Sequence, residues 1–165
     1  MHISAMEEYG LRCALQLARQ PEQAPLSASI IAKREGISLE YVSKLMHRFR
    51  KAGMVKAIRG VSGGFTLAQP AHLISLKSVM ESISGKKPSG AFCTQYSGKQ
   101  DSCVHLSDCS VRPVWTTLSG YFDDLLGQLT LADLIKKEST LQTQVSHLAA
   151  SKSKQLKNYF LEGAL

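Results

Sequence analysis

Three of the four cysteines in this 165-residue chain lie close together, at Cys93, Cys103 and Cys109. Thiolates gathered in a stretch rich in glycine and serine form a pocket of soft ligands, which suits zinc or an iron–sulfur cluster. The fourth cysteine, Cys13, falls on the apolar stripe of a predicted helix, and we expect it to be a core residue. The spacing therefore indicates a metal centre in the loop over residues 89–110.

The sequence also indicates the cellular compartment of the protein. The chain has no apolar run near the ~20 residues that a membrane span needs, and its N-terminus lacks the features of a signal peptide. We therefore expect a cytoplasmic protein with no membrane partner, in which thiols stay reduced. In that compartment, clustered cysteines indicate metal ligands or redox thiols rather than disulfides.

Positive charge is concentrated between Lys33 and Arg59. This segment has eight lysine and arginine residues against two glutamates, so it holds +6 of the chain's net charge of +7. A solvated surface needs no such concentration, which favours a nucleic-acid partner. The sequence offers no nucleophile–base pair, phosphate loop or substrate motif, and we do not expect an enzyme.

Serine caps and apolar periodicity predict a helix-turn-helix in the first half of the chain. Ser4 and Glu7 form a capping box that starts a helix over about 5–19. A short second helix begins at Ser27 or Ser29.

The third helix is the one expected to read double-stranded DNA. Ser38 caps it, it runs over about 39–52, and Gly53 closes it. Its apolar residues recur at helical spacing and face the core; they are Val42, Leu45, Met46 and Phe49. The polar face that remains is available to enter a major groove.

Two short strands over 54–58 and 65–67 follow, joined by the glycine-rich turn 59–64, and they predict a hairpin wing. A fourth helix, capped by Ser75, returns to the core and stops at Gly85. The residues placed to contact DNA are Ser38, Glu40, Tyr41, Ser43, Lys44, Arg48, Arg59, Ser62 and Gly63.

A long helix follows the cysteine loop, with Ser110 as its expected cap. Its apolar residues alternate at three and four positions, the a/d spacing of a coiled-coil seam. A bundle core would show the same spacing, but a domain already closed by four helices has little core left, so a homodimer seam is favoured. The seam residues are Trp115, Leu118, Phe122, Leu125 and Leu129. A short helix over 130–138 follows, and the sequence does not decide whether the polar stretch after it is helical.

The predicted fold is mainly α with a small β-hairpin wing: a winged helix-turn-helix plus a long dimerisation helix. It divides into a DNA-binding domain over 1–88, a cysteine loop over 89–110, dimerisation helices over 111–138 and a polar C-terminal tail over 139–165.

The chain resembles the winged-helix transcriptional regulators that include the iron–sulfur assembly regulator IscR and the nitric-oxide sensor NsrR. The resemblance covers about residues 1–138. Besides the three cysteines and Trp115, it rests on the motifs at Glu8–Arg12, Gly36–Ser38, Arg59–Ala68 and Thr130–Leu134.

This resemblance implies a homodimeric regulator whose operator binding is controlled by an iron–sulfur cluster, 2Fe–2S or 4Fe–4S, that senses redox state, nitric oxide or iron supply. Its ligands would be Cys93, Cys103 and Cys109. IscR-like members have a histidine three residues after the last cysteine; this chain has Arg112 there, and a guanidinium cannot coordinate a metal. In NsrR-like members a carboxylate on the first helix of the other subunit completes the site, and Glu8 stands at that position.

Other interpretations of the cysteines stay open. Zinc could be held by the three cysteines with His105, although the paired short C-x-x-C motifs that favour zinc are absent. A cluster-free thiol switch could form a disulfide between Cys103 and Cys109. A lone cluster could also serve electron transfer, but the wing and the third helix favour a DNA-binding regulator.

Overall fold

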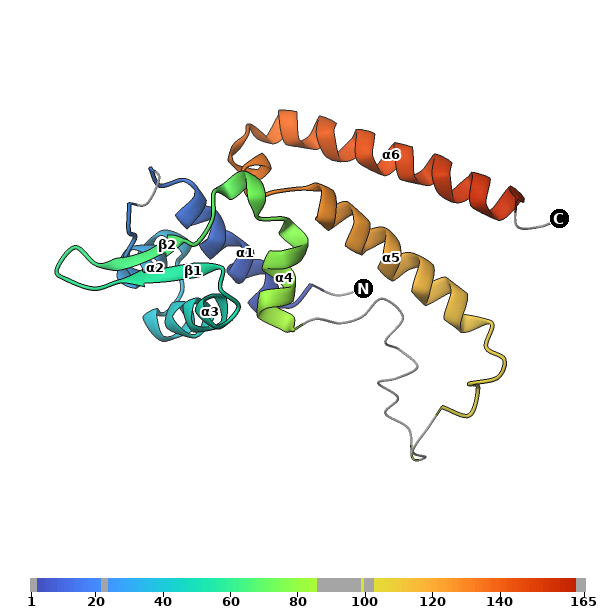
Figure 1. Ribbon diagram of the computed structural model, residues 1–165, viewed down its shortest axis with the longest axis horizontal. Helices are drawn as coiled ribbons and strands as arrows, with labels where there is room; N and C mark the ends of the chain where they lie inside the picture. The colour runs from blue at the N-terminus through green and yellow to red at the C-terminus, as the bar shows by residue number, and fades with distance from the viewer. Residues whose placement is uncertain (1–2, 22–23, 86–98, 100–102, 163–165) are drawn as a thin grey trace.

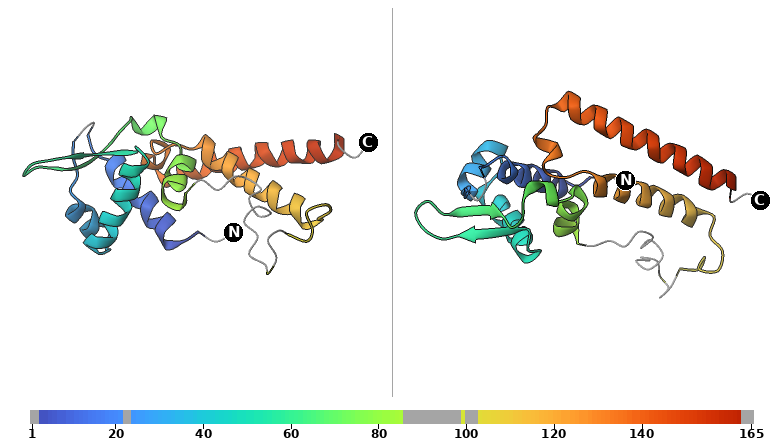
Figure 2. Two further views of the ribbon diagram at one scale, coloured as in Figure 1. Left: turned by 60° about the horizontal axis from the view of Figure 1, so that its bottom comes forward. Right: turned by 45° about the horizontal axis from the view of Figure 1, so that its top comes forward.

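The chain forms a helical head from which two long helices project (Figure 1, Figure 2). The computed structural model describes residues 3–21, 24–85, 99 and 103–162. Helices α5 (Val111–Gln128) and α6 (Glu138–Glu162) leave the head on the side opposite the hairpin. The mainly α fold with a hairpin wing is confirmed.

The head contains helices and strands in the predicted order. They are α1 (Ala5–Ala18), α2 (Ala28–Glu35), α3 (Leu39–Lys51), β1 (Val55–Ile58), β2 (Gly64–Leu67) and α4 (Leu76–Ser84). Two 3-10 turns precede α4 and α6, namely η1 (Ala71–Leu73) and η2 (Asp133–Ile135).

Serine hydroxyls start the helices of the head, as predicted. The Ser4 hydroxyl accepts a hydrogen bond from the Glu7 N–H, and the Glu7 carboxylate accepts one from the Ser4 N–H. Ser27, Ser38 and Ser75 cap α2, α3 and α4 through their hydroxyls. Each cap satisfies an N–H that the helix itself leaves unpaired, and is worth ~1 kcal/mol.

The cap predicted at Ser110 is absent. Its hydroxyl makes no capping hydrogen bond, and its backbone angles, φ −65° and ψ −17°, are already helical. An N-cap residue needs an extended backbone to aim its side chain at the first N–H groups. Helix α5 therefore begins without a side-chain cap.

The packing of the head depends on the inner face of α3. Val42, Leu45, Met46 and Phe49 are all fully buried, as their spacing predicts. They join side chains of α1, α2 and α4 in one apolar cluster. Burying side chains of this size stabilises the fold by ~1.5–3 kcal/mol each. Because these four residues point inward, the polar residues between them are turned to the surface.

Helices α1 and α4 approach closely at Gly10. A Cβ atom there would lie 2.0 Å from Cδ1 and 3.0 Å from Cγ1 of Ile83. The Ile83 side chain is itself fully buried and cannot move aside freely. The crossing therefore requires glycine at this position, although glycine weakens a helix.

After α5 the chain returns to the head. The Leu76 N–H donates to the Leu129 carbonyl at 2.8 Å, and the Leu131 N–H donates to the Ile74 carbonyl at 2.9 Å. Leu129 and Leu131 are 5% and 0% exposed. The sequence assigns Leu129 to a dimer seam, but the structure buries it in the protomer's own core, because α5 has ended and Leu129 is extended.

The segment after this anchor also differs from its prediction. The helix expected over 130–138 is reduced to the single turn η2, and α6 begins at Glu138. The polar stretch that the sequence leaves undecided is helical as far as Glu162.

Asp133 joins this turn to α6 through partly buried hydrogen bonds. Its carboxylate accepts from the Thr130 N–H and hydroxyl, both at 2.8 Å. It also accepts from the Lys136 ammonium at 2.6 Å and the Gln144 amide at 3.1 Å. Burial alone raises the pKa of Asp133, but the hydrogen bonds from Lys136, Thr130 and Gln144 outweigh it and hold the pKa well below its ordinary value.

The first prediction concerns the α1–α4 crossing. Gly10→Ala should lower the free energy of unfolding by ~1–3 kcal/mol, because the added methyl overlaps the Ile83 side chain. Denaturant unfolding measures the change. Ile83→Val removes the atom that would lie closest, so the double variant should lose less than the sum of the two single variants. Strict additivity would show that the two side chains do not meet.

The second prediction concerns the pH dependence of stability. A depressed pKa in the folded state means that Asp133 contributes stability above its unfolded pKa, ~3.9. That contribution is lost as pH falls below this value toward the folded pKa. Asp133→Asn should therefore be less stable than the parent at pH 7 by ~1–3 kcal/mol, and the difference should shrink below pH ~4.

Denaturant unfolding at several pH values between about 3 and 7 measures the free energy of unfolding and checks this prediction. Asp108→Asn is the matched control, since Asp108 is exposed. A difference between Asp133→Asn and the parent that stays constant with pH would show that the carboxylate's charge is not what stabilises the turn.

Candidate DNA interface and cysteine loop

The turn between α2 and α3 has the geometry that a helix-turn-helix requires. Gly36 closes α2 in the left-handed conformation, with φ 65° and ψ 33°, a region that glycine enters without steric cost. Two residues later, Ser38 caps α3, its hydroxyl accepting from the Tyr41 N–H at 3.2 Å. The turn thus fixes the angle at which the outer face of α3 is presented.

The residues of α3 predicted to read DNA differ in their exposure to solvent. Glu40, Ser43 and Lys44 are exposed, whereas Tyr41 is half-buried. The Tyr41 ring meets the Tyr9 ring of α1 edge-on, with centroids 6.1 Å apart and planes at 82°. Tyr41 therefore contributes packing as well as a hydroxyl group at the edge of the surface.

Glu40 is held as a carboxylate at the start of α3. Hydrogen bonds from its own backbone N–H and from the Ser38 hydroxyl keep its pKa below the ordinary value. An exposed carboxylate in this place can accept a hydrogen bond from the amino group of a base.

Arg48 differs from the other predicted contacts. Its guanidinium is half-buried and donates to the carbonyl oxygen of Ile83, in the last turn of α4. A free carbonyl at a helix C-terminus needs such a donor. This contact assigns Arg48 to the packing of α3 against α4 rather than to the outer face of α3.

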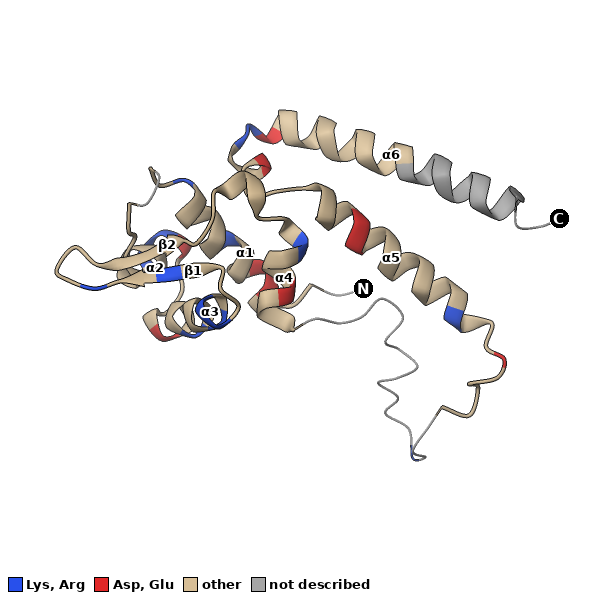
Figure 3. Ribbon diagram, in the orientation of Figure 1, with Lys and Arg blue, Asp and Glu red and all other residues tan. Residues whose placement is uncertain are grey.

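The wing is an antiparallel hairpin in which Val55 pairs with Leu67 and Ile58 with Gly64. Arg59 and Ser62 are exposed at its tip. A Cβ at Gly63 would lie 2.4 Å from the Ile58 carbonyl oxygen, so this glycine is needed for the hairpin to close. In Figure 3, the ribbon is coloured blue for Lys and Arg at positions along α2, α3 and the wing.

Two exposed apolar residues belong to the same elements and were not among the sequence's candidates. Leu39, the first residue of α3, is 48% exposed, and Val61 at the tip of the wing is fully exposed. Only their positions in the sequence could have indicated this exposure: Leu39 follows the cap of α3, and Val61 follows Gly60 in the turn.

Cys13 is a core residue, as the sequence predicts. It is fully buried in α1, and burial, with a smaller contribution from Glu35, raises its pKa to about 12. The sulfur stays protonated at neutral pH, and a protonated thiol is a poor metal ligand.

The predicted ligands lie in different parts of the chain. Cys103 and Cys109 are half-buried free thiols ahead of α5, and Cys93 lies outside the described residues. Glu8 is exposed on α1 and pairs with Arg12 at 2.8 Å. In the part of the chain that the structure describes, no three His, Cys, Asp or Glu residues come together as a metal site.

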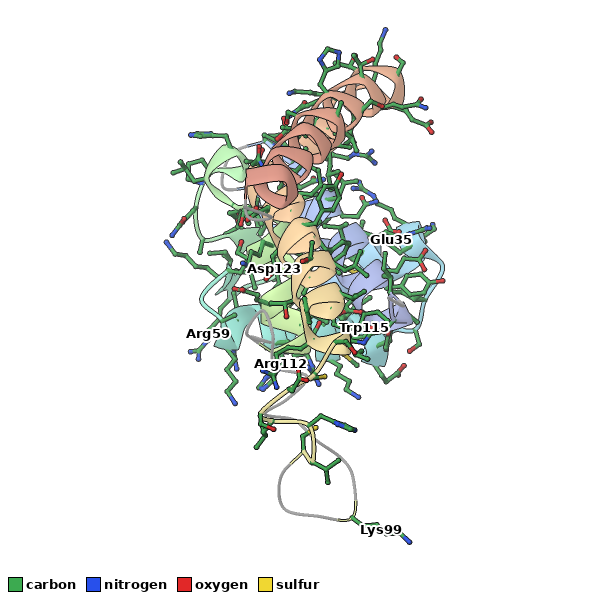
Figure 4. The ribbon with its side chains drawn as sticks, turned by 90° about the vertical axis from the view of Figure 1, so that its right-hand side faces the viewer. Glu35, Arg59, Lys99, Arg112, Trp115 and Asp123 are labelled. Carbon is green, nitrogen blue, oxygen red and sulfur yellow. The ribbon has the colours of Figure 1, made fainter. Side chains whose placement is uncertain are left out.

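The loop between the two cysteines is organised by Arg112. Its guanidinium donates to the carbonyl oxygens of His105 and Leu106, at 3.0 and 2.7 Å. Its backbone N–H donates to the Cys109 carbonyl at 3.2 Å, and the Leu106 N–H donates to the Cys103 carbonyl at 3.3 Å. Figure 4 shows Arg112 where α5 meets the loop.

The first turns of α5 expose an apolar stripe. Val111, Val114, Trp115 and Leu118 are 44–54% exposed and recur at three- and four-residue spacing. Of the other predicted seam residues, Phe122 and Leu125 are half-buried. Among the described helices, none is long and apolar enough to cross a membrane.

Comparison with known proteins shows relatives along most of the chain. The model of the Rrf2 family, described as an iron-dependent transcriptional regulator, matches residues 3–137. The HTH-type transcriptional regulator IscR of Vibrio campbellii is 31% identical over 142 residues, which cover 86% of this chain and 82% of that protein. IscR of Vibrio cholerae is 30% identical over 92% of this chain and 86% of its own length.

Solved structures share the fold. CymR of B. subtilis, described as the global cysteine regulator, has a TM-score of 0.66 at 26% identity and covers 81% of this chain and 95% of its own. IscR of T. potens has a TM-score of 0.63 at 28% identity, covering 82% of this chain and 86% of its own. The relatives are named as regulators, which agrees with the expectation that the chain is not an enzyme.

Proposed function

Because the chain belongs to the Rrf2 family of transcriptional regulators, we propose that it is a dimeric DNA-binding regulator whose operator binding is controlled by an iron–sulfur cluster. One observation carries the DNA-binding part of this proposal. The buried face of α3 leaves Glu40, Ser43 and Lys44 outward, beside a wing with Arg59 at its tip. These side chains supply both base readers and phosphate contacts.

The dimer presents two α3 helices to successive major grooves, and the two wings lie over the flanking minor grooves. Lysine and arginine side chains neutralise phosphates, which supplies affinity without reading sequence. Glu40, Ser43 and Lys44, with the Tyr41 hydroxyl, read base edges. Ser38 positions them, since its hydroxyl is already used as the cap of α3.

The homodimer is supported by the exposed stripe on α5. Val111, Val114, Trp115 and Leu118 form an apolar surface along one face of a helix that stands away from the head. The same stripe in a second copy matches it in length and chemistry, and a two-fold interface is self-complementary. Phe122 extends this interface toward the head, whereas Leu125 packs against the protomer's own core.

The proposed cluster would be held by Cys93, Cys103 and Cys109 of one subunit and Glu8 of the other. The donor chemistry fits, since soft thiolates are the usual ligands of iron–sulfur clusters. Glu8 is exposed on α1, so its carboxylate is accessible to a second subunit. When bound, the cluster would supply a centre that responds to redox state, nitric oxide or iron supply.

Glu8 stands on a helix that also touches the reading helix. Its partner Arg12 lies over the Tyr9 ring, 5.7 Å from the ring centre. The Tyr9 ring in turn meets Tyr41 of α3. When the loop of the other subunit leaves Glu8, the Glu8–Arg12 pair rearranges and the packing of α1 on α3 changes with it. The angle between the two reading helices then shifts.

A cluster-free thiol regulator is the second candidate. Cys103 and Cys109 are both free thiols on one short loop, and neither is deeply buried. The likeness to CymR, a structure described as a cysteine regulator, favours this class as well. In it, oxidation of the two thiols to a disulfide would reshape the loop and α5 together.

The third prediction tests DNA recognition. Operator affinity should fall roughly a thousandfold or more between 50 and 200 mM salt, the range over which phosphate contacts are lost. Arg59→Ala should weaken binding to every sequence and reduce the salt slope by ~1, whereas Lys44→Ala should lose ~1–3 kcal/mol of discrimination at one base pair. Fluorescence anisotropy with operator variants separates the two effects.

Two variants sharpen this test. Lys99→Ala removes one positive charge from an exposed residue far from Arg59 in Figure 4, and it should leave the slope unchanged. Tyr41→Phe keeps the ring packed on Tyr9 and removes only the hydroxyl. If Lys99→Ala weakens binding as much as Arg59→Ala, net charge and not the wing supplies the affinity.

The fourth prediction tests the cluster and its ligands. Serine at Cys93, Cys103 or Cys109 should bleach the visible absorption of anaerobically prepared protein. Cys13→Ala should retain it, because that sulfur is buried and protonated. Glu8→Ala should keep a cluster with an altered spectrum and altered lability, since an oxygen ligand can be lost without dismantling three thiolates.

A mixed dimer tests ligation across subunits. One Glu8→Ala subunit paired with one Cys103→Ser subunit has one fully native site and one doubly defective site. It should therefore give half the parent absorption per dimer, with the parent spectrum. Intact regulation without any iron or sulfide in the protein would instead support the thiol regulator.

A further inference from the structure

We propose that Arg112 orders the loop carrying Cys103 and Cys109, and that its Nε–H donates a hydrogen bond to a sulfur of the bound cluster. The second part rests on the proposed cluster, whereas the first does not. Arg112 stands where IscR-like proteins have a histidine, and it cannot act as that ligand. Its contacts show a different role.

The loop is built around the guanidinium. Two carbonyl oxygens between the cysteines, those of His105 and Leu106, point at one Arg112 nitrogen. The backbone of the same residue holds the Cys109 carbonyl. Arg112 therefore contacts the loop at three of its main-chain oxygens, from a position fixed in the first turn of α5.

Few other interactions within the loop could order it besides these hydrogen bonds. Residues 104–108 are all exposed, and their side chains bury no apolar core. A loop without a core is ordered by its hydrogen bonds, and those from a charged donor are about twice as strong as neutral ones. Removing the guanidinium should therefore loosen the cysteine loop without unfolding the head.

One donor of Arg112 is left over. Its Nε is buried and has no hydrogen-bond partner among the described residues. Arg112 and Cys109 line one hollow of about 520 Å³, together with Ser107, Asp108 and Thr116. A buried unpaired donor costs free energy, and a cluster sulfur held beside Cys109 would be an acceptor for it.

A hydrogen bond to a cluster sulfur has a measurable consequence. It stabilises the more negative, reduced state, so it raises the reduction potential. Arg112 would thus be a positioning residue that also tunes the cluster. Lysine at this position keeps the positive charge but has no Nε–H, and its flexible stem does not hold its ammonium in the fixed plane that a guanidinium has.

The first arm of the test uses cluster-free protein. Amide hydrogen exchange of the peptide over 103–110 should be roughly tenfold or more faster in Arg112→Ala and Arg112→Lys than in the parent, the effect of losing charged hydrogen bonds. Arg19→Ala removes an exposed arginine at the end of α1 and should leave this peptide unchanged. Unchanged exchange in both Arg112 variants would overturn the ordering role.

The second arm uses anaerobically reconstituted protein. Arg112→Lys should bind a cluster with the parent iron content but titrate at a lower reduction potential. A parent-like potential in Arg112→Lys would overturn the sulfur hydrogen bond even if the exchange rate had risen. If the parent itself takes up no cluster, the proposed function fails, and the exchange arm still decides whether Arg112 orders the loop.

Discussion

The anchorage of Leu129 and Leu131 in the head is the contact on which the rest of the structure depends. Both side chains are buried among residues of the head, and backbone hydrogen bonds tie them to Ile74 and Leu76. Helix α5 is therefore held firmly at its inner end, while its outer end carries the cysteine loop. In the proposed regulator, a change in how the outer end of α5 packs would be carried to the head through this anchor.

The sequence predicts the head well because the forces that shape it are local. Serine caps and the spacing of Val42 and Phe49 act within one or two turns of helix, and the structure confirms them. Leu129 shows where this reasoning stops. It continues the a/d spacing of α5, but a neighbouring backbone, that of Leu76, ends the pattern by pairing with it. No local signal records a contact between residues so far apart in the chain.

The sequence predicts the reading residues of α3 only as far as the helical spacing of the apolar residues determines which side chains are exposed. Glu40, Ser43 and Lys44 lie outward because the residues between them are buried. Arg48 has nearly the same helical phase as Lys44, but its long side chain reaches sideways to a carbonyl of α4. Arg112 was recognised only as a residue that cannot bind metal. Its hydrogen bonds depend on a loop conformation that composition does not encode.

The cysteine loop and the apolar stripe of α5 are adjacent in the chain, so sensing and assembly would be linked in the proposed regulator. Arg112 lies between Val111 and Pro113, so the side chain that holds the loop belongs to the same helical turn as the start of the stripe. Ser110 supplies no cap, which leaves that turn dependent on Arg112 and on the Cys109 carbonyl. A loop that loosens therefore frays the first turn of α5, where the partner subunit would pack. In the proposed dimer, fraying there would weaken the contact between subunits, and the inner end of α5 would carry the change to the head.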